Sequence, residues 1–214
     1  MRQIKFNRVV QIIYPLLVYF VLYQLGVGLL IDSYGDKLGK LMCLLIAGTI
    51  CIIPMYIIYK TVPKPIPKPI ETRKEWFFCG LWVVTVVTIG LMLNFVITQS
   101  GLLDYSDGFE RASETLSDGS LVVKILCNAI VIPILEELLI RGIVAGQLYL
   151  WYGMWPAVVL SSICFGIMHN NIVQFIYALI IGILLGLMYV KNKRIVLCIL
   201  THGLLNLLVI MLSY

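Results

Sequence analysis

The sequence predicts an all-α polytopic membrane protein, a bundle of about seven transmembrane helices with a cytoplasmic N-terminus. Hydrophobic residues make up 61% of the 214 residues and charged residues only 13%, whereas soluble domains average about 45–50% and about 25%. Apolar runs of about 20 residues, long enough to cross a bilayer, recur along the chain. This composition also excludes a disordered chain. We therefore expect membrane lipid among the partners and no nucleic acid.

Seven apolar runs separated by short polar links are the predicted spans. They cover residues 9–31, 41–59, 76–98, 121–140, 155–168, 172–190 and 195–214. The first run is too long for the apolar core of a signal peptide, so we interpret it as a retained helix. The fifth run is the shortest, about 21 Å at 1.5 Å per residue. It should be tilted or partly buried in the bundle.

The charges of the links predict the orientation, because short cytoplasmic loops carry an excess of Lys and Arg. The N-terminus and the second and sixth links are basic, with Arg2, Lys5, Arg8, Lys60, Lys64, Lys68, Arg73, Lys74, Lys191, Lys193 and Arg194. The third link is acidic, with Asp104, Asp107, Glu110, Glu114 and Asp118. Seven spans with the N-terminus inside satisfy every link. A count of six, without the fifth run, would place the last basic link outside.

A proline-rich linker divides the chain. Prolines occupy every second position from 63 to 69, so residues 62–70 should be extended rather than helical. Residues 1–75 then comprise two helices and this basic, proline-rich cytoplasmic linker, and residues 76–214 form a five-helix membrane bundle with the motifs described below, within one integral membrane domain. We interpret it as a stiff cytoplasmic spacer; a peptide that docks a partner is the alternative.

Ionisable residues within the predicted spans point to a functional site. Glu136 and Glu137 are the acidic residues inside a predicted span, and both histidines, His169 and His202, lie in or at the end of apolar runs. An ionisable group at membrane depth costs at least about 2.5–3.5 kcal/mol, and it normally faces a cavity or the bundle interior. We predict one shared polar site in the last four spans.

The local spacing suggests how the fourth span carries its charges. Glu137 and Arg141 are one helical turn apart and can form an ion pair. Glu136 is rotated about 100° from Glu137 and has no local partner. Pro133 withholds an amide from the carbonyl of Ala129 and should kink the helix. Taken alone, Arg141 could instead extend to the membrane surface.

Two further pairs are spaced four residues apart, so that each shares a helix face. They are Phe165 with His169, and His202 with Asn206. A single intramembrane His or Asn can also serve only to bridge two helices, and Phe165 alone is typical of packing.

Together these residues resemble the signature of the CPBP (Abi, or CAAX protease) family of intramembrane endopeptidases, which includes the eukaryotic prenyl-protein protease. The family motifs EExxxR, FxxxH and HxxxN resemble residues 136–141, 165–169 and 202–206, in that order. The similarity extends over about residues 121–210. Each motif alone is weak evidence, whereas three in order are specific.

The resemblance implies a role for each matching residue. Glu136, as general base, and His169 would hold and activate a water molecule. His202 and Asn206 would stabilise the oxyanion. Glu137 and Arg141 would form a supporting pair, with Phe165 also in a supporting position. A positioned base and preorganised hydrogen-bond donors are what amide hydrolysis without a covalent intermediate requires.

Cofactor use is left open by the resemblance. Glu136, His169 and His202 could hold a catalytic zinc with water in the fourth position. These ligands would have to come from three separate helices, and no HExxH is present. We expect a metal-free site.

The function predicted is therefore that of an intramembrane endopeptidase acting on a membrane-associated or lipidated peptide or protein. The alternatives are a proton-coupled transporter and a non-catalytic peptide-binding or bacteriocin-immunity member of the same family. We expect a bacterial plasma membrane protein. Glu136 should lie about 6–9 Å from the cytoplasmic end of a span that ends at residue 140, which predicts a site open to the cytoplasm or the inner leaflet.

Overall fold

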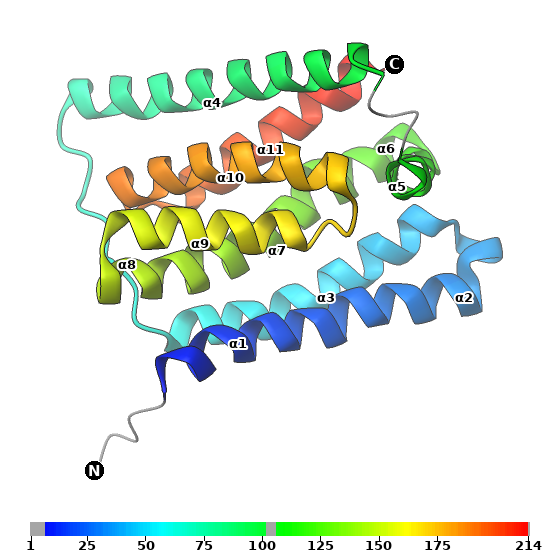
Figure 1. Ribbon diagram of the computed structural model, residues 1–214, viewed down its shortest axis with the longest axis horizontal. Coiled ribbons are helices and arrows are strands. Elements are labelled where there is room, and N and C mark those ends of the chain that lie inside the picture. The colour runs from blue at the N-terminus through cyan, green and yellow to red at the C-terminus, as the bar shows by residue number, and fades with distance from the viewer. Residues whose placement is uncertain (1–6, 102–105, 214) are drawn as a thin grey trace.

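The computed structural model describes residues 7–101 and 106–213, and within them every regular element is helical (Figure 1). The expected all-α membrane bundle is thus confirmed. Arg2, Lys5 and Asp104, which contributed to the predicted charge pattern, lie outside the described residues.

The first two predicted spans form a helical hairpin. The first helix is continuous from Arg8 to Leu38 and consists of α1 (Arg8–Tyr19), a π-helical segment (Phe20–Leu25) and α2 (Gly26–Leu38). The chain then reverses at a single residue, Gly39, into α3 (Lys40–Thr61). Gly39 has φ 86°, a conformation that glycine adopts without steric cost. This freedom explains why one residue suffices as the link.

The proline-rich linker is non-helical, as predicted, and runs along one end of the bundle to α4 (Arg73–Gln99). Nζ of Lys64 donates to the carbonyl oxygen of Tyr59 at 2.6 Å. The guanidinium of Arg194 donates to the carbonyl of Lys68. These contacts hold the linker against the ends of the helices. Its interpretation as a spacer stays a prediction.

The acidic third link contains a helix that the sequence reading missed, α5 (Asp107–Ser117). It has no long apolar run, which is why a search for spans passes over it. The hydroxyl of Ser106 caps its first turn by accepting from the amide of Phe109 at 3.2 Å. After α5, Oδ2 of Asp118 accepts from the amide of Lys40 at 2.6 Å. The acidic link is thereby tied to the turn between α2 and α3.

The fourth predicted span is longer than expected. One continuous helix consists of α6 (Leu121–Lys124), a π-helical segment (Ile125–Val131), α7 (Ile132–Glu137), a second π-helical segment (Leu138–Ala145) and α8 (Gly146–Tyr152). The prediction that this span ends at residue 140 was wrong. The charged side chains suggested a boundary, but the structure buries them in mid-helix, as described below. We refer to the whole as the α6–α8 helix.

The last three helices follow with short turns. Gly153, with φ 84°, separates the α6–α8 helix from α9 (Met154–Ile167), and α10 (Ile172–Asn192) and α11 (Ile195–Leu212) complete the bundle. By length and composition, five of the described helices can cross a membrane: Arg8–Leu38, α3, α4, α10 and α11. α9 is a shorter apolar helix, as its predicted span suggested. The count of seven spans and the orientation stay predictions.

The α6–α8 helix lies at the centre of the bundle, and every residue from Leu135 to Leu148 is buried. α11 approaches this helix closely at Gly203. A β-carbon at Gly203 would lie 2.4 Å from the carbonyl oxygen of Ala129, which is the carbonyl that Pro133 deprives of its α-helical donor. Proline in one helix and glycine in the other therefore allow an approach that brings the neighbouring His202 to the central helix.

We expect Gly203→Ala to destabilise the protein by about 1–3 kcal/mol, because a methyl group here forces two packed helices apart. Thermal unfolding of the purified protein in detergent measures this change. Gly80→Ala is the matched control, since a β-carbon at Gly80 meets nothing within 4 Å. A Gly203 variant as stable as the Gly80 variant would contradict this account of the contact.

Candidate functional site

The first and third sequence motifs meet at the carboxylate of Glu137. Its Oε1 atom lies 3.0 Å from Nη1 of Arg141, one turn along the same helix, and 3.0 Å from Nδ1 of His202 in α11. Arg141 also donates from Nη2 to the carbonyl oxygen of Gly182 in α10 at 3.2 Å. Glu137 and Arg141 are both fully buried. The predicted ion pair is therefore present, and it also holds α10 and α11.

Glu136 faces the other side of the same imidazole. Its Oε2 atom lies 3.9 Å from Nε2 of His202. Glu136 retains 7% exposure and His202 retains 6%, whereas Glu137 has none. The two adjacent carboxylates thus differ in environment: Glu137 is enclosed and paired, and Glu136 borders open space.

Phe165 joins the second motif to the other two. Its ring makes edge contacts with the imidazoles of His169 and His202, with centroids 5.1 and 5.8 Å apart. The guanidinium carbon of Arg141 lies 4.6 Å from the centre of the same ring. Phe165 was predicted in a supporting position, and it contacts a side chain of each motif.

His169 lies in the turn between α9 and α10, just beyond the last residue of α9. Its Nδ1 atom is 2.9 Å from the carbonyl oxygen of Phe165. A carbonyl can only accept, so Nδ1 carries a proton in this contact, and in the neutral form of the ring the lone pair is then at Nε2. Asn170 reverses the chain with φ 55°, and Asn171 caps α10 by accepting from the amide of Gln174 at 2.8 Å.

Asn206 is oriented by a residue that the sequence reading missed. Its Nδ2 atom donates to the backbone carbonyl of Asn128 at 2.8 Å, while the side-chain amide of Asn128 donates to the carbonyl of Leu116 in α5 at 3.4 Å. The available signal was an amide side chain within an otherwise apolar run. One hydrogen of the Asn206 amide is thereby engaged, and the other is left for a further acceptor.

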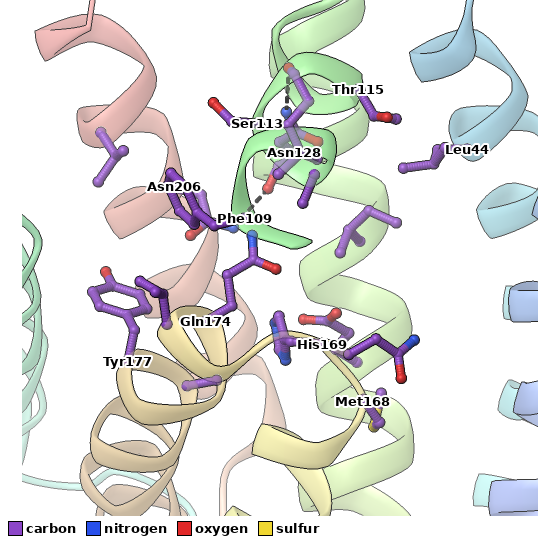
Figure 2. Close-up of a pocket in the computed structure, with 18 of the residues that line it drawn as sticks. Leu44, Phe109, Ser113, Thr115, Asn128, Met168, His169, Gln174, Tyr177 and Asn206 are labelled. Atoms are coloured by element: carbon purple, nitrogen blue, oxygen red, sulfur yellow. Dashed lines mark hydrogen bonds between the residues drawn. The ribbon is translucent and has the colours of Figure 1, made fainter. Parts of the chain in front are cut away.

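These residues surround one cavity of about 1030 Å³. Figure 2 shows side chains of α5, α10, α11, the α6–α8 helix and the α9–α10 turn around this space. The cavity wall includes Glu136, Phe165, His169, His202 and Asn206, but neither Glu137 nor Arg141. The predicted catalytic group and the predicted supporting ion pair are thus separated by the cavity wall.

The first helix also contributes to the cavity, although the sequence showed only membrane character there. Tyr19, Tyr23 and Gln24 line it. Both tyrosines lie close enough to Glu136 for an electrostatic interaction. Nε2 of Gln24 donates to the carbonyl of Met168 at 3.2 Å. The N-terminal hairpin therefore closes one side of the site and supports the turn that carries His169.

The cavity extends toward the end of the bundle that carries α5. Its wall includes Asn94 and Thr98 near the end of α4, and Ser213 after α11. The basic links lie at the opposite end (Figure 1). A cytoplasmic N-terminus and a site open to the cytoplasm or the inner leaflet were both expected, whereas the cavity extends away from the end of the bundle at which α1 begins. The side of the membrane on which the site opens stays a prediction.

The fit of a metal ion can be judged from the same side chains. Within residues 7–101 and 106–213, no three side chains of His, Cys, Asp or Glu form a group that could hold a metal ion. Glu136, His169 and His202, which were named as ligands only in the case that zinc is bound, are not among such groups as their side chains are placed here.

The fold and the site define an integral membrane protein with a buried, partly open cluster of carboxylate, imidazole and amide groups. Two comparisons with known proteins identify relatives. Residues 118–208 match the family described as type II CAAX prenyl endopeptidase Rce1-like. YdiL of Bacillus subtilis (strain 168), named as a candidate membrane peptidase, is 28% identical over 170 residues, which cover 76% of this chain and 68% of the relative.

Both similarities support the CPBP, or CAAX protease, family for this chain, and with it a CAAX-type membrane protease. The matched range nearly coincides with the range over which the three motifs resemble that family. The resemblance inferred from the motifs is thus confirmed. No solved structure matches the chain.

The buried ion pair leads to a stability prediction. Arg141→Met leaves the carboxylate of Glu137 buried without the guanidinium that pairs with it, and breaking such a pair costs about 3–5 kcal/mol. Replacing both members, in Glu137→Gln with Arg141→Met, removes the uncompensated charge and should restore most of this loss. Thermal unfolding in detergent measures both variants. An Arg141 variant with wild-type stability would show that the pair does not hold the helices together.

Proposed function

We propose that this protein is an intramembrane endopeptidase that hydrolyses a peptide bond in a membrane-associated or lipidated peptide or protein. One observation carries the proposal: Glu136, His169, His202 and Asn206, which come from three separate motifs, line the same cavity. The relationship to CAAX-type peptidases supports the reaction class. The Bacillus origin of the relative YdiL supports placing the protein in a bacterial plasma membrane.

Glu136 and His169 act on the attacking water in this proposal. The carboxylate of Glu136 accepts one hydrogen of the water, and Nε2 of His169 accepts the other, because its Nδ1–H is committed to the carbonyl of Phe165. A lone pair of the water oxygen is then directed at the substrate carbonyl carbon. As the new C–O bond forms, Glu136 takes the proton as general base.

His202 and Asn206 stabilise the oxygen that becomes negative. Nδ1–H of His202 is directed to Glu137, so donation to an oxyanion requires a second proton, on Nε2. Nε2 of His202 lies 3.9 Å from Oε2 of Glu136, on the side of the imidazole that borders the cavity. The free amide hydrogen of Asn206 is the second donor. Each such donor lowers the barrier by about 2.7–4 kcal/mol.

The reaction ends with cleavage of the C–N bond. Glu136 returns the proton it took from water to the leaving nitrogen, so that one water is consumed and an acid and an amine are formed. Glu137 does not exchange protons in this scheme. Its role is to keep His202 in place, with Arg141 holding the carboxylate.

Glu136→Gln, His169→Ala and His202→Ala should each reduce cleavage by at least about 10²-fold, because each removes a proton acceptor or an oxyanion donor. Cleavage of an internally quenched reporter peptide with a hydrophobic anchor, in proteoliposomes, measures this loss. Glu114→Gln is the matched control, since Glu114 is an exposed carboxylate on α5. The proposal fails if any of the three variants is folded and cleaves as the control does.

We also propose that the site works without a metal ion, since the water can be held by Glu136 and His169 alone. Cleavage should be unchanged by a strong chelator, and the purified active protein should contain less than one equivalent of zinc. Loss of cleavage with the chelator, and its recovery on adding zinc, would assign Glu136, His169 and His202 as ligands instead.

A further inference from the structure

We infer that the substrate reaches the site from the non-cytoplasmic side of the membrane, and that the substrate class is therefore a polypeptide segment exposed at that face. This inference rests on the proposed function. It is carried by three independent observations: which end of the bundle is closed, which end is open, and how Lys and Arg are distributed between the two ends.

The bundle is closed between the site and the basic links. Along the α6–α8 helix all residues from Leu135 to Leu148 are buried, a length of roughly 20 Å at 1.5 Å per residue. The paired charges of Glu137 and Arg141 form the first layer of this packing, directly beyond Glu136. Below them, the side chain of Gln147 is also fully buried. A polypeptide arriving at this end would have to displace the central helix packing.

The bundle is open in the other direction. α9 is short, so the α9–α10 turn that holds His169 stops before the end of the neighbouring helices (Figure 1). The space above this turn is the cavity, and its outer wall is formed by residues of α5 such as Phe109, Ser113 and Ser117. The walls there carry amide and hydroxyl groups, including Asn94 and Gln174, together with the basic side chains of Arg111 and Lys124. Such groups can exchange hydrogen bonds with an extended peptide backbone.

The distribution of Lys and Arg assigns these ends to the two sides of the membrane. The closed end carries Arg8 and the basic residues of the links 60–74 and 191–194. The open end carries the acidic third link and the turn at Gly39, where Lys37 and Lys40 accompany Asp32 and Asp36, so that acidic residues outnumber basic ones at this end. Because short loops rich in Lys and Arg stay in the cytoplasm, the closed end is cytoplasmic and the cavity opens on the other side.

This assignment restricts the substrate. A lipidated C-terminus anchored in the cytoplasmic leaflet would meet the closed end of the bundle. A segment of a membrane protein or exported peptide that leaves the bilayer at the outer surface would meet the cavity. We therefore assign the second class, a peptide presented from the outer face, as the substrate of this site.

Single cysteines at the two ends test the orientation in intact bacterial cells that express the protein. Ile66→Cys marks the linker, where Ile66 is 86% exposed, and Glu114→Cys marks the exposed face of α5. The unsubstituted protein, whose native cysteines are buried or half-buried, gives the background. A membrane-impermeant maleimide should label the Glu114 variant in intact cells and the Ile66 variant only after permeabilisation. The opposite pattern would overturn the inference.

Proteoliposomes test the side of access. The same two variants report what fraction of molecules exposes each end to the outside, and the anchored reporter peptide is added only from outside. Cleavage should follow the fraction that exposes α5, and attachment of a bulky maleimide at Ser117→Cys should abolish it. Cleavage that follows the linker-exposing fraction would overturn this inference alone. No cleavage by either population would overturn the proposed function as well.

Discussion

The arrangement of the site depends on one carboxylate oxygen, Oε1 of Glu137, which is shared by the guanidinium of Arg141 and the imidazole of His202. Three elements meet there because Arg141 also binds a carbonyl of α10. A buried charge without a partner is strongly destabilising. Moving α10 or α11 away would remove a hydrogen-bond partner from the buried Arg141 or Glu137, so both helices are held in this position. The contacts that neutralise the buried charges of Glu137 and Arg141 are therefore the same contacts that place His202 in the site.

Backbone shape makes this contact possible. Pro133 leaves the carbonyl of Ala129 without its α-helical donor, and the winding on both sides of α7 is π-helical. Such segments are frequent at functional sites because they redirect side chains within a continuous helix. Gly203 then removes the side chain that would collide with that carbonyl. Glu136 and Glu137 are adjacent in sequence, yet one borders the cavity and the other is enclosed.

The sequence was sufficient for the all-α membrane bundle, because apolar length is a local property. Local spacing also selected Glu136, His169, His202 and Asn206, which line one cavity, whereas their catalytic roles stay predictions. The sequence was not sufficient for the role of Asn128, because the amide side chain in its apolar run does not show that the backbone carbonyl of the same residue accepts from Asn206. It also could not reveal Tyr19 and Tyr23, which reach Glu136 only through packing of the first helix. The length of the α6–α8 helix was underestimated for a similar reason, because its charges are neutralised by residues of distant helices.

The position of His202 and Asn206 on α11 has a consequence for biosynthesis. A chain emerging from the ribosome acquires the carboxylates of the central helix first, then His169, and only afterwards the last imidazole. Before α11 is in place, the bundle holds the proposed base but neither of the two proposed oxyanion donors. Under the proposed function, the last helix to be synthesised is therefore the one that completes the site.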